Sequence, residues 1–226
     1  MNDAPILRRG LGLLGGTFDP VHAGHLALAS AVLSAIPLIR LEFIPAGDPW
    51  QKHGISPGLH RLNMLRIAVE YEPRFRVSTA ELCRSGPTYT IDTVRSLRQE
   101  VGPAMPLVLI LGFDQWRNLT TWRSWQTLTD YVHIAWCNRA GAEPAPIDPV
   151  QTAWAEPRTA APCDLIHSPC GRIACFDMPP HRASATAVRR IMSAYPFPTA
   201  MKRLDGWLPI GVAQYIRMHG LYGSRQ

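Results

Sequence analysis

Short apolar runs alternate along this chain with segments of helical periodicity, and this alternation constrains the fold more than any other feature. The strongest run is Leu107–Leu111, five consecutive aliphatic residues followed by Gly112. Strands that are apolar on both faces are typical of parallel sheets covered by helices, whereas half-exposed strands alternate apolar with polar residues. Further short strands are predicted at residues 11–14, 41–44, 75–77, 133–136 and 173–176.

Helices are predicted between these strands, at residues 24–35, 58–70 and 88–101, where good helix formers or apolar residues at helical spacing occur. The order of strands and helices predicts an α/β fold with a Rossmann-like, doubly wound sheet that is mainly parallel. Residues 140–170 interrupt this rhythm with six prolines between Ala140 and Pro169, so we predict an irregular, partly helical insertion there. A C-terminal helical part is predicted over residues 184–222.

Length and composition indicate a single domain, residues 1–226, that buries its own core. Of the 226 residues 46% are hydrophobic and 18% charged, which excludes a disordered chain and a coiled coil. No apolar run approaches the roughly 18 residues that a membrane-spanning helix needs. The N-terminal segment lacks the features of a signal peptide, so we expect a cytoplasmic protein. The net charge of +6 is compatible with an anionic ligand but does not identify one.

A cluster of cysteines and histidines raises the question of a zinc site. Cys163, His167, Cys170 and Cys175 lie within thirteen residues, with His181 just beyond. Thiolates and imidazoles are ligands that zinc prefers, but the spacing Cys-x3-His-x2-Cys-x4-Cys is not one of the usual paired patterns. Cys175 also falls in a predicted strand, where we expect its thiol to pack as a small hydrophobic group. We therefore predict reduced cysteines and no zinc site.

The loop after the first predicted strand carries the densest chemical pattern. Residues 15–25 read Gly-Gly-Thr-Phe-Asp-Pro-Val-His-Ala-Gly-His. Ligands of doubly wound sheets bind at the carboxyl ends of strands, glycines let the backbone approach a ligand closely, and helix N-termini bind phosphate. His22 and His25 are three residues apart, so on a first helical turn their imidazoles point the same way. A tight turn with two surface histidines is the alternative, but the combined pattern favours a phosphate site.

This loop resembles the signature of the nucleotidyltransferases that share a His-x-Gly-His motif. Within that superfamily the chain is similar to the bacterial nicotinate-nucleotide adenylyltransferases. The chain departs from the usual pattern in three places: Ala183 stands where many members have Ile, residues 48–53 replace the frequent Pro-Pro-His-Lys, and the stretch of residues 140–169 as a whole has no match. Further matching segments lie at residues 87–93, 112–114, 121–122, 137–141, 184–189 and 220–222.

The resemblance implies transfer of AMP from ATP to nicotinate mononucleotide, which gives deamido-NAD and pyrophosphate in NAD biosynthesis. The attacking phosphate is already an anion, so catalysis needs positioning and charge neutralisation rather than a strong base. The implied partners are these small molecules and Mg²⁺ carried with ATP, with no nucleic acid and no membrane. The residues implied are His22, His25 and Arg189 for catalysis; Gly15, Gly16, Thr17, Phe18, Gly112, Asp114, Ser184 and Thr186 for ATP; and Tyr89, Thr90, Trp122, Lys52 and Arg139 for nicotinate mononucleotide.

Several of these residues have a structural reading as well. Ser184 is predicted to be a helix N-cap, with Thr186 in the first turn, so that this helix start grips phosphate. Asp114 is either a ligand of a ribose hydroxyl or of the metal shell, or a helix N-cap. Trp122 is either a platform on which the pyridinium stacks or a core aromatic, and Trp116 and Trp125 lie nearby as other candidates.

Two other functions stay open at this point. One is a different adenylyl- or cytidylyltransferase of the same superfamily. The other is a nucleotide- or RNA-binding module without catalysis, against which the presence of His22, His25 and Arg189 argues.

Overall fold

The computed structural model describes residues 9–47, 54–139 and 147–224. It divides into two compact units, and each is considered by itself. The first unit comprises the described residues within Met1–Gly15, Leu28–Glu42 and Thr88–Pro179, and the second those within Gly16–Ala27, Phe43–Pro87 and Pro180–Gln226. The assignment of the whole chain to one domain stays a prediction.

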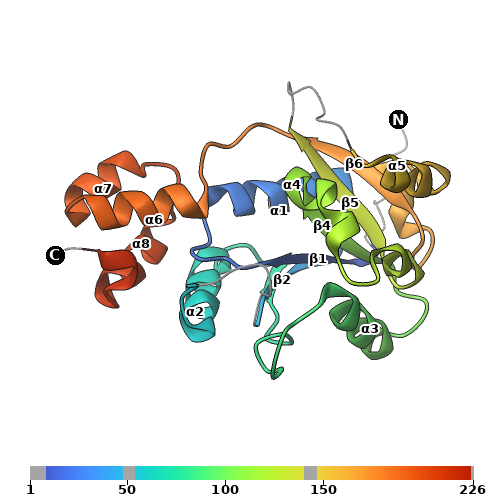
Figure 1. Ribbon diagram of the computed structural model, residues 1–226, viewed down its shortest axis with the longest axis horizontal. Coiled ribbons are helices and arrows are strands. Elements are labelled where there is room, and N and C mark those ends of the chain that lie inside the picture. The colour runs from blue at the N-terminus through green and yellow to red at the C-terminus, as the bar shows by residue number, and fades with distance from the viewer. Residues whose placement is uncertain (1–8, 48–53, 140–146, 225–226) are drawn as a thin grey trace. The chain divides into compact units, whose positions relative to one another are not determined.

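A six-stranded parallel sheet with the order β3-β2-β1-β4-β5-β6 organises the fold. The order reverses between β1 and β4, as in a doubly wound sheet, and the predicted fold class is confirmed. The register pairs Leu11 with Leu107 in β1 and β4, and Val108 with His133 in β4 and β5. Figure 1 shows β4, β5 and β6 side by side. The strands are β1 (Leu11–Gly16), β2 (Arg40–Pro45), β3 (Phe75–Val77), β4 (Leu107–Gly112), β5 (His133–Arg139) and β6 (Ile173–Met178).

Helices α1 (Ala23–Ala35), α2 (Gly58–Val69) and α3 (Thr90–Val101) occupy the three segments predicted to be helical between strands. Helix α3 begins two residues later than predicted, because Tyr89 has an extended backbone and takes the N-cap position. The remaining helices are α4 (Phe113–Arg117), α5 (Pro149–Ala155), α6 (Ala185–Ala194), α7 (Phe197–Arg203) and α8 (Ile210–Met218). Short 3-10 helices occupy Leu119–Thr121, Trp125–Asp130, Glu156–Arg158, Pro162–Ile166 and Leu221–Gly223.

The core of the first unit forms around the strands that sequence periodicity located. All residues of the apolar run in β4, Leu107–Leu111, are at most 4% exposed. Gly12 in β1 was not singled out from the sequence, yet the packing requires it. A Cβ at this position would lie 2.9 Å from Leu38 Cδ1 and 3.0 Å from Ile110 Cδ1. The predicted insertion contains α5 and two of the 3-10 helices, while residues 140–146 lie outside the described residues.

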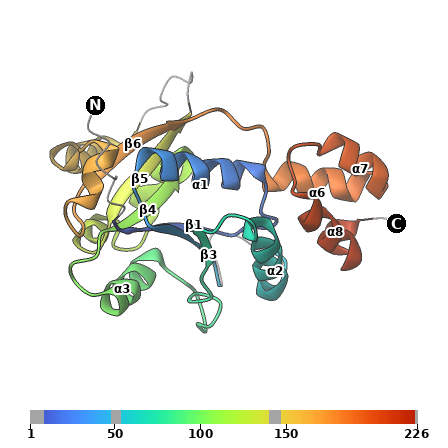
Figure 2. The ribbon, with the colours of Figure 1, turned by 180° about the vertical axis from the view of Figure 1, so that it is seen from behind.

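The second unit ends in the predicted C-terminal helical part. Helices α6, α7 and α8 lie together in this region in both views (Figure 1, Figure 2). Helix α8 packs against α2, and the last 3-10 helix packs against α6 and α8. None of the helices in residues 9–47, 54–139 and 147–224 is long and apolar enough to cross a membrane.

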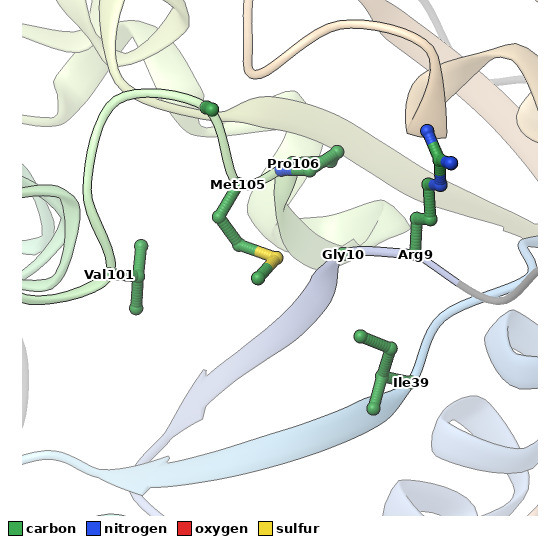
Figure 3. A pocket seen from close by; sticks show the side chains of 7 residues that line it. Arg9, Gly10, Ile39, Val101, Met105 and Pro106 are labelled. Carbon is green, nitrogen blue, oxygen red and sulfur yellow. The ribbon is translucent and has the colours of Figure 1, made fainter.

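An open cavity of about 310 Å³ lies in the first unit, at the amino ends of β1 and β4 (Figure 3). The residues that precede these two strands, Gly10 and Pro106, line it together with apolar side chains such as Met105 and Ile39. In doubly wound folds the ligand site is at the opposite, carboxyl ends of the strands. None of the residues that line the cavity is among those predicted to bind the nucleotide.

Candidate functional site

The loop between β1 and α1 is held tightly in the second unit by its own aromatic residue. Phe18 is 2% exposed and has a left-handed backbone, with φ of +52°. A Cβ on Gly16 would lie 2.9 Å from Phe18 Cζ, so glycine is required there. The Phe18 ring also contacts the ring of His25 edge-on, with centroids 5.0 Å apart. Because the side chain of Phe18 lies in the core, its predicted contribution to ATP binding would have to come from the backbone.

The imidazoles of His22 and His25 lie together, as their spacing predicted. Their ring centroids are 3.8 Å apart and their planes differ by 30°. The backbone N–H of His22 donates to His25 Nδ1 at 3.2 Å. Since Nδ1 of His25 is an acceptor, the neutral ring carries its proton on Nε2. His25 is therefore prepared to donate a hydrogen bond from Nε2.

His22 has a different electrostatic environment. It is 7% exposed, and its Nδ1 is buried without a hydrogen-bond partner in the described structure. Burial, and to a smaller extent the nearby charge of His181, lowers the pKa of His22 from 6.5 to about 4. His22 is consequently neutral at physiological pH, where it still carries one N–H donor.

The start of α6 comes to the same loop. Ser184 is the N-cap, and its Oγ accepts a hydrogen bond from the backbone N–H of Ala187 at 3.2 Å, which confirms the predicted cap. Thr186 lies exposed in the first turn. The Nη1 of Arg189 donates to the backbone carbonyl of Asp19 at 2.7 Å. Thus the two motifs that the sequence separates by about 160 residues share one side of the second unit.

Gly24, the glycine of the His-x-Gly-His motif, permits this approach. A Cβ at Gly24 would lie 3.1 Å from His22 Nδ1 and 3.3 Å from the carbonyl oxygen of Ala183. Such contacts are tighter than ordinary van der Waals packing, so a larger residue would push the segment before α6 away from His22. The glycine therefore has a packing role that the sequence alone did not reveal.

A buried arginine that sequence analysis missed stabilises the loop between β1 and α1 by hydrogen bonding. Arg61 in α2 is 1% exposed and donates to the backbone carbonyls of Thr17 at 2.9 Å, Ser56 at 2.9 Å and Gly47 at 3.2 Å. Burial lowers its pKa, and the charge of Asp19 acts against that shift. The sequence contained a signal for this burial, because Arg61 precedes Met64 and Leu65 by three and four residues and therefore lies on the apolar face of the predicted helix.

Asp19 is the second residue that sequence analysis left without a role. Its carboxylate is buried, with the side chain 3% exposed. One oxygen, Oδ2, accepts from the backbone N–H of Ser56 at 3.1 Å, and Oδ1 accepts from the hydroxyl of Tyr222 at 2.5 Å. The resemblance had marked Tyr222 only as part of a C-terminal sequence match.

Two of the residues predicted to bind ATP are glycines of the first unit. Gly15 and Gly112 are at the carboxyl ends of β1 and β4, the strands that flank the reversal of strand order. A Cβ on either glycine would meet no atom within 4 Å. Asp114 lies exposed in the first turn of α4, whose N-cap is Gly112. The N-cap reading of Asp114 is therefore wrong, and its contact with ribose or the metal shell stays a prediction.

The segments that carry Tyr89 and Trp122 are close together. The guanidinium carbon of Arg123 lies 4.9 Å from the centroid of the Tyr89 ring. Trp122 is half-buried, and its Nε1 is buried without a hydrogen-bond partner in the described structure. Trp116 is instead a core residue, 2% exposed and stacked on Trp136 with centroids 5.5 Å apart. This packing removes Trp116 as a platform for the pyridine ring.

The structure describes the other residues predicted to bind nicotinate mononucleotide only in part. Thr90 is the first residue of α3, and Arg139 is the last residue of β5, but the side chain of Arg139 is outside the described residues. Lys52 and His53 also lie outside them.

The cysteine cluster does not form a recognisable metal site. In the described part of the chain, no three His, Cys, Asp or Glu residues are grouped so that they could hold a metal ion. The thiol of Cys170 donates to the carbonyl of Asp130 at 3.3 Å. Cys175 is exposed on β6, so the expectation that its thiol packs in the core is wrong. Within β6 the buried residues are Ile173 and the two neighbours of Cys175, Ala174 and Phe176.

The chain is similar in sequence to a protein family model and to relatives from several bacteria. A family model described as cytidylyltransferase-like matches residues 13–191. A probable nicotinate-nucleotide adenylyltransferase of Herminiimonas arsenicoxydans is 39% identical over 220 residues, covering 96% of this chain and 98% of the relative. The corresponding protein of Bordetella petrii is 39% identical over 216 residues, covering 94% and 98%.

Solved structures show the same fold. The Plasmodium falciparum nicotinic acid mononucleotide adenylyltransferase complexed with NaAD superposes with a TM-score of 0.71. The match covers 96% of this chain and 99% of that one at 16% sequence identity. At this identity the likeness supports the architecture, and the roles of individual residues have to come from the chemistry of the site.

Proposed function

The chain belongs to the nicotinate-nucleotide adenylyltransferase family, and we propose that the loop after β1 and the start of α6 hold the reacting phosphates. The reaction joins the phosphate of nicotinate mononucleotide to the α-phosphorus of ATP and releases pyrophosphate. The observation that carries the proposal is the hydrogen bond from Arg189 to the carbonyl of Asp19, at 2.7 Å. It brings a phosphate-binding side chain from α6 to the loop that carries His22 and His25.

The charges of these residues suit an adenylyl transfer. The transition state places additional negative charge on oxygens around the α-phosphorus, and preorganised donors stabilise that charge. His22 is neutral because burial lowers its pKa to about 4, so it donates without first losing or gaining a proton near pH 7. Arg189 supplies a permanent positive charge, and two of its five N–H donors are used within the protein, one by the carbonyl of Asp19 and one by the hydroxyl of Thr186 at 3.5 Å.

The α6 N-terminus adds a second set of donors. The helix is ten residues long, and Ser184 and Thr186 place hydroxyl groups beside its first free N–H groups. Helix N-termini favour anions through these N–H groups and the helix dipole. We assign the β- and γ-phosphates of ATP to this helix start, and the α-phosphate to the imidazoles.

The acceptor nucleotide is assigned to residues of the first unit. Trp122 and Tyr89 supply aromatic surface, on which a cationic pyridinium ring is stabilised. The guanidinium of Arg123 beside Tyr89 adds positive charge, which suits a carboxylate better than an amide. These features support a preference for nicotinate over nicotinamide mononucleotide.

Magnesium would enter with the nucleotide. It prefers oxygen ligands, keeps part of its water shell and is commonly held through one or two carboxylates together with substrate phosphates. The exposed carboxylate of Asp114 on α4 fits this donor type, and we assign to it the metal's water shell or a ribose hydroxyl. When bound, the ion would neutralise part of the charge on the triphosphate.

Pyrophosphate release from ATP tests the proposal directly. The purified protein is given nicotinate mononucleotide, nicotinamide mononucleotide, phosphopantetheine or no acceptor. We expect the highest kcat/KM with nicotinate mononucleotide, and equal values for the two pyridine nucleotides would contradict the assigned specificity. Release only with phosphopantetheine would indicate a different member of the superfamily, and release with none of them would indicate a binding module.

A further inference from the structure

Asp19 connects three distant segments of the second unit, which contribute Ser56, Arg189 and Tyr222. Its carboxylate accepts from the Tyr222 hydroxyl at 2.5 Å and from the Ser56 N–H at 3.1 Å. Its backbone carbonyl accepts from Arg189 at 2.7 Å. One residue of the loop is thus held through its side chain by the C-terminal segment, while its backbone holds the arginine assigned to the phosphates.

The burial of this network makes each hydrogen bond matter. Asp19 is 3% exposed, so water does not replace a lost donor. A hydrogen bond that a hydroxyl donates to a carboxylate is shorter and stronger than one between neutral groups. Arg61 fixes the loop from the other end through the carbonyl of Thr17, at 2.9 Å. The residues between Thr17 and Asp19 are therefore restrained on both sides.

The backbone of the network also carries strain. Among the described residues, the non-glycine positions with positive φ are Phe18, Ser124 and Tyr222. Two of these three belong to the loop or to its C-terminal partner. Left-handed backbone at bulky residues persists where the surroundings hold it, and such positions are concentrated at functional sites. The conformation of Tyr222, with φ of +59°, is consistent with a position held for its hydrogen bond.

We propose that Tyr222 is a positioning residue for adenylyl transfer. Its hydroxyl fixes the Asp19 carboxylate, and through Asp19 it sets the position of the loop and of the Arg189 guanidinium. The inference rests on the function proposed above. Because Tyr222 acts through Asp19, its loss should slow the chemical step more than it weakens binding of nicotinate mononucleotide.

A matched control separates this role from ordinary stabilisation of the C-terminal segment. Tyr215 on α8 also uses its hydroxyl to hold that segment against α2. Its oxygen lies 3.0 Å from His60 Nδ1 and accepts from Asn63 Nδ2 at 3.0 Å. Neither partner belongs to the loop. Removing this hydroxyl should therefore affect stability but leave the loop in place.

The experiment compares Tyr222→Phe with Tyr215→Phe and the wild-type enzyme. For each, kcat and KM are measured with nicotinate mononucleotide and ATP, together with the thermal midpoint. We expect Tyr222→Phe to lower kcat by about 10- to 100-fold, the range that small misplacements of reacting groups produce, with the KM for nicotinate mononucleotide nearly unchanged. Tyr215→Phe should keep the wild-type kcat. An unchanged kcat in Tyr222→Phe, or an equal loss in both variants, would overturn the inference.

A double-mutant cycle tests the route through Asp19 and Arg189. In an Arg189→Gln background, Tyr222→Phe should lower kcat by only a small further factor, because the group it positions is already gone. Losses that multiply fully would show that the two residues act independently, which contradicts the proposal. Wild-type activity is measured first: its absence would contradict the proposed function, whereas an active wild type with an unaffected Tyr222→Phe contradicts this inference alone.

Discussion

The buried, neutral state of His22 should appear as a pH dependence of stability. The folded protein binds the His22 proton with a pKa of about 4, and the unfolded chain binds it near 6.5. Between these values the unfolded state holds more protons, so the free energy of unfolding falls as the pH falls. This stability is fully present above pH 6.5 and is lost progressively down to pH 4. For one histidine the loss between about pH 7.5 and about pH 5 amounts to about 2 kcal/mol.

Urea unfolding at these two pH values measures the effect in the wild type and in His22→Gln. The glutamine variant should lack the contribution of this histidine, so its free energy of unfolding should fall less over the same interval, by about 2 kcal/mol. His167→Gln, a substitution at an exposed histidine, is the control for the exchange of histidine for glutamine. If His22→Gln and the wild type lost the same free energy, the reasoning from burial to a neutral imidazole would be refuted.

Four further outcomes are expected. His22→Ala and His25→Ala should each lower kcat by roughly 10²–10³-fold, with a smaller change in ATP binding, and near wild-type turnover in steady-state assays would remove the loop from the catalytic centre. Trp122→Ala should raise the KM for nicotinate mononucleotide and leave that for ATP nearly unchanged; a shift in the ATP constant instead would place Trp122 elsewhere. Arg61→Met should lower the free energy of unfolding by roughly 3 kcal/mol or more, because three backbone carbonyls lose their donor, and a stability equal to wild type in urea would contradict that support. Elemental analysis should find less than about 0.1 zinc per chain, and a value near one, with unfolding on chelation, would make residues 140–180 a metal-organised segment.

Much of the architecture follows from the sequence because its signals are local. The apolar run in β4 can only be buried on both faces, and the glycine that follows it ends the strand, so neighbouring residues decide the element. The cap at Ser184 is equally local, since the cap side chain and the N–H that it binds are three residues apart. The spacing of His22 and His25 fixed their proximity for the same reason.

Tertiary structure alone decided which side chains support these motifs. The sequence of α2 contains two arginines, Arg61 and Arg66, and only packing shows that Arg61 is the one buried against the loop. The exposure of Cys175 was decided in the same way, because one position in a strand faces the core or the solvent according to what packs on each face. Tyr222 meets Asp19 across 203 residues of chain, and no local pattern encodes such a contact. Hydrogen bonds between distant segments depend on how the elements pack, so the His-x-Gly-His motif can be recognised in the sequence, whereas the hydrogen-bond network around Asp19 is visible only in the folded molecule.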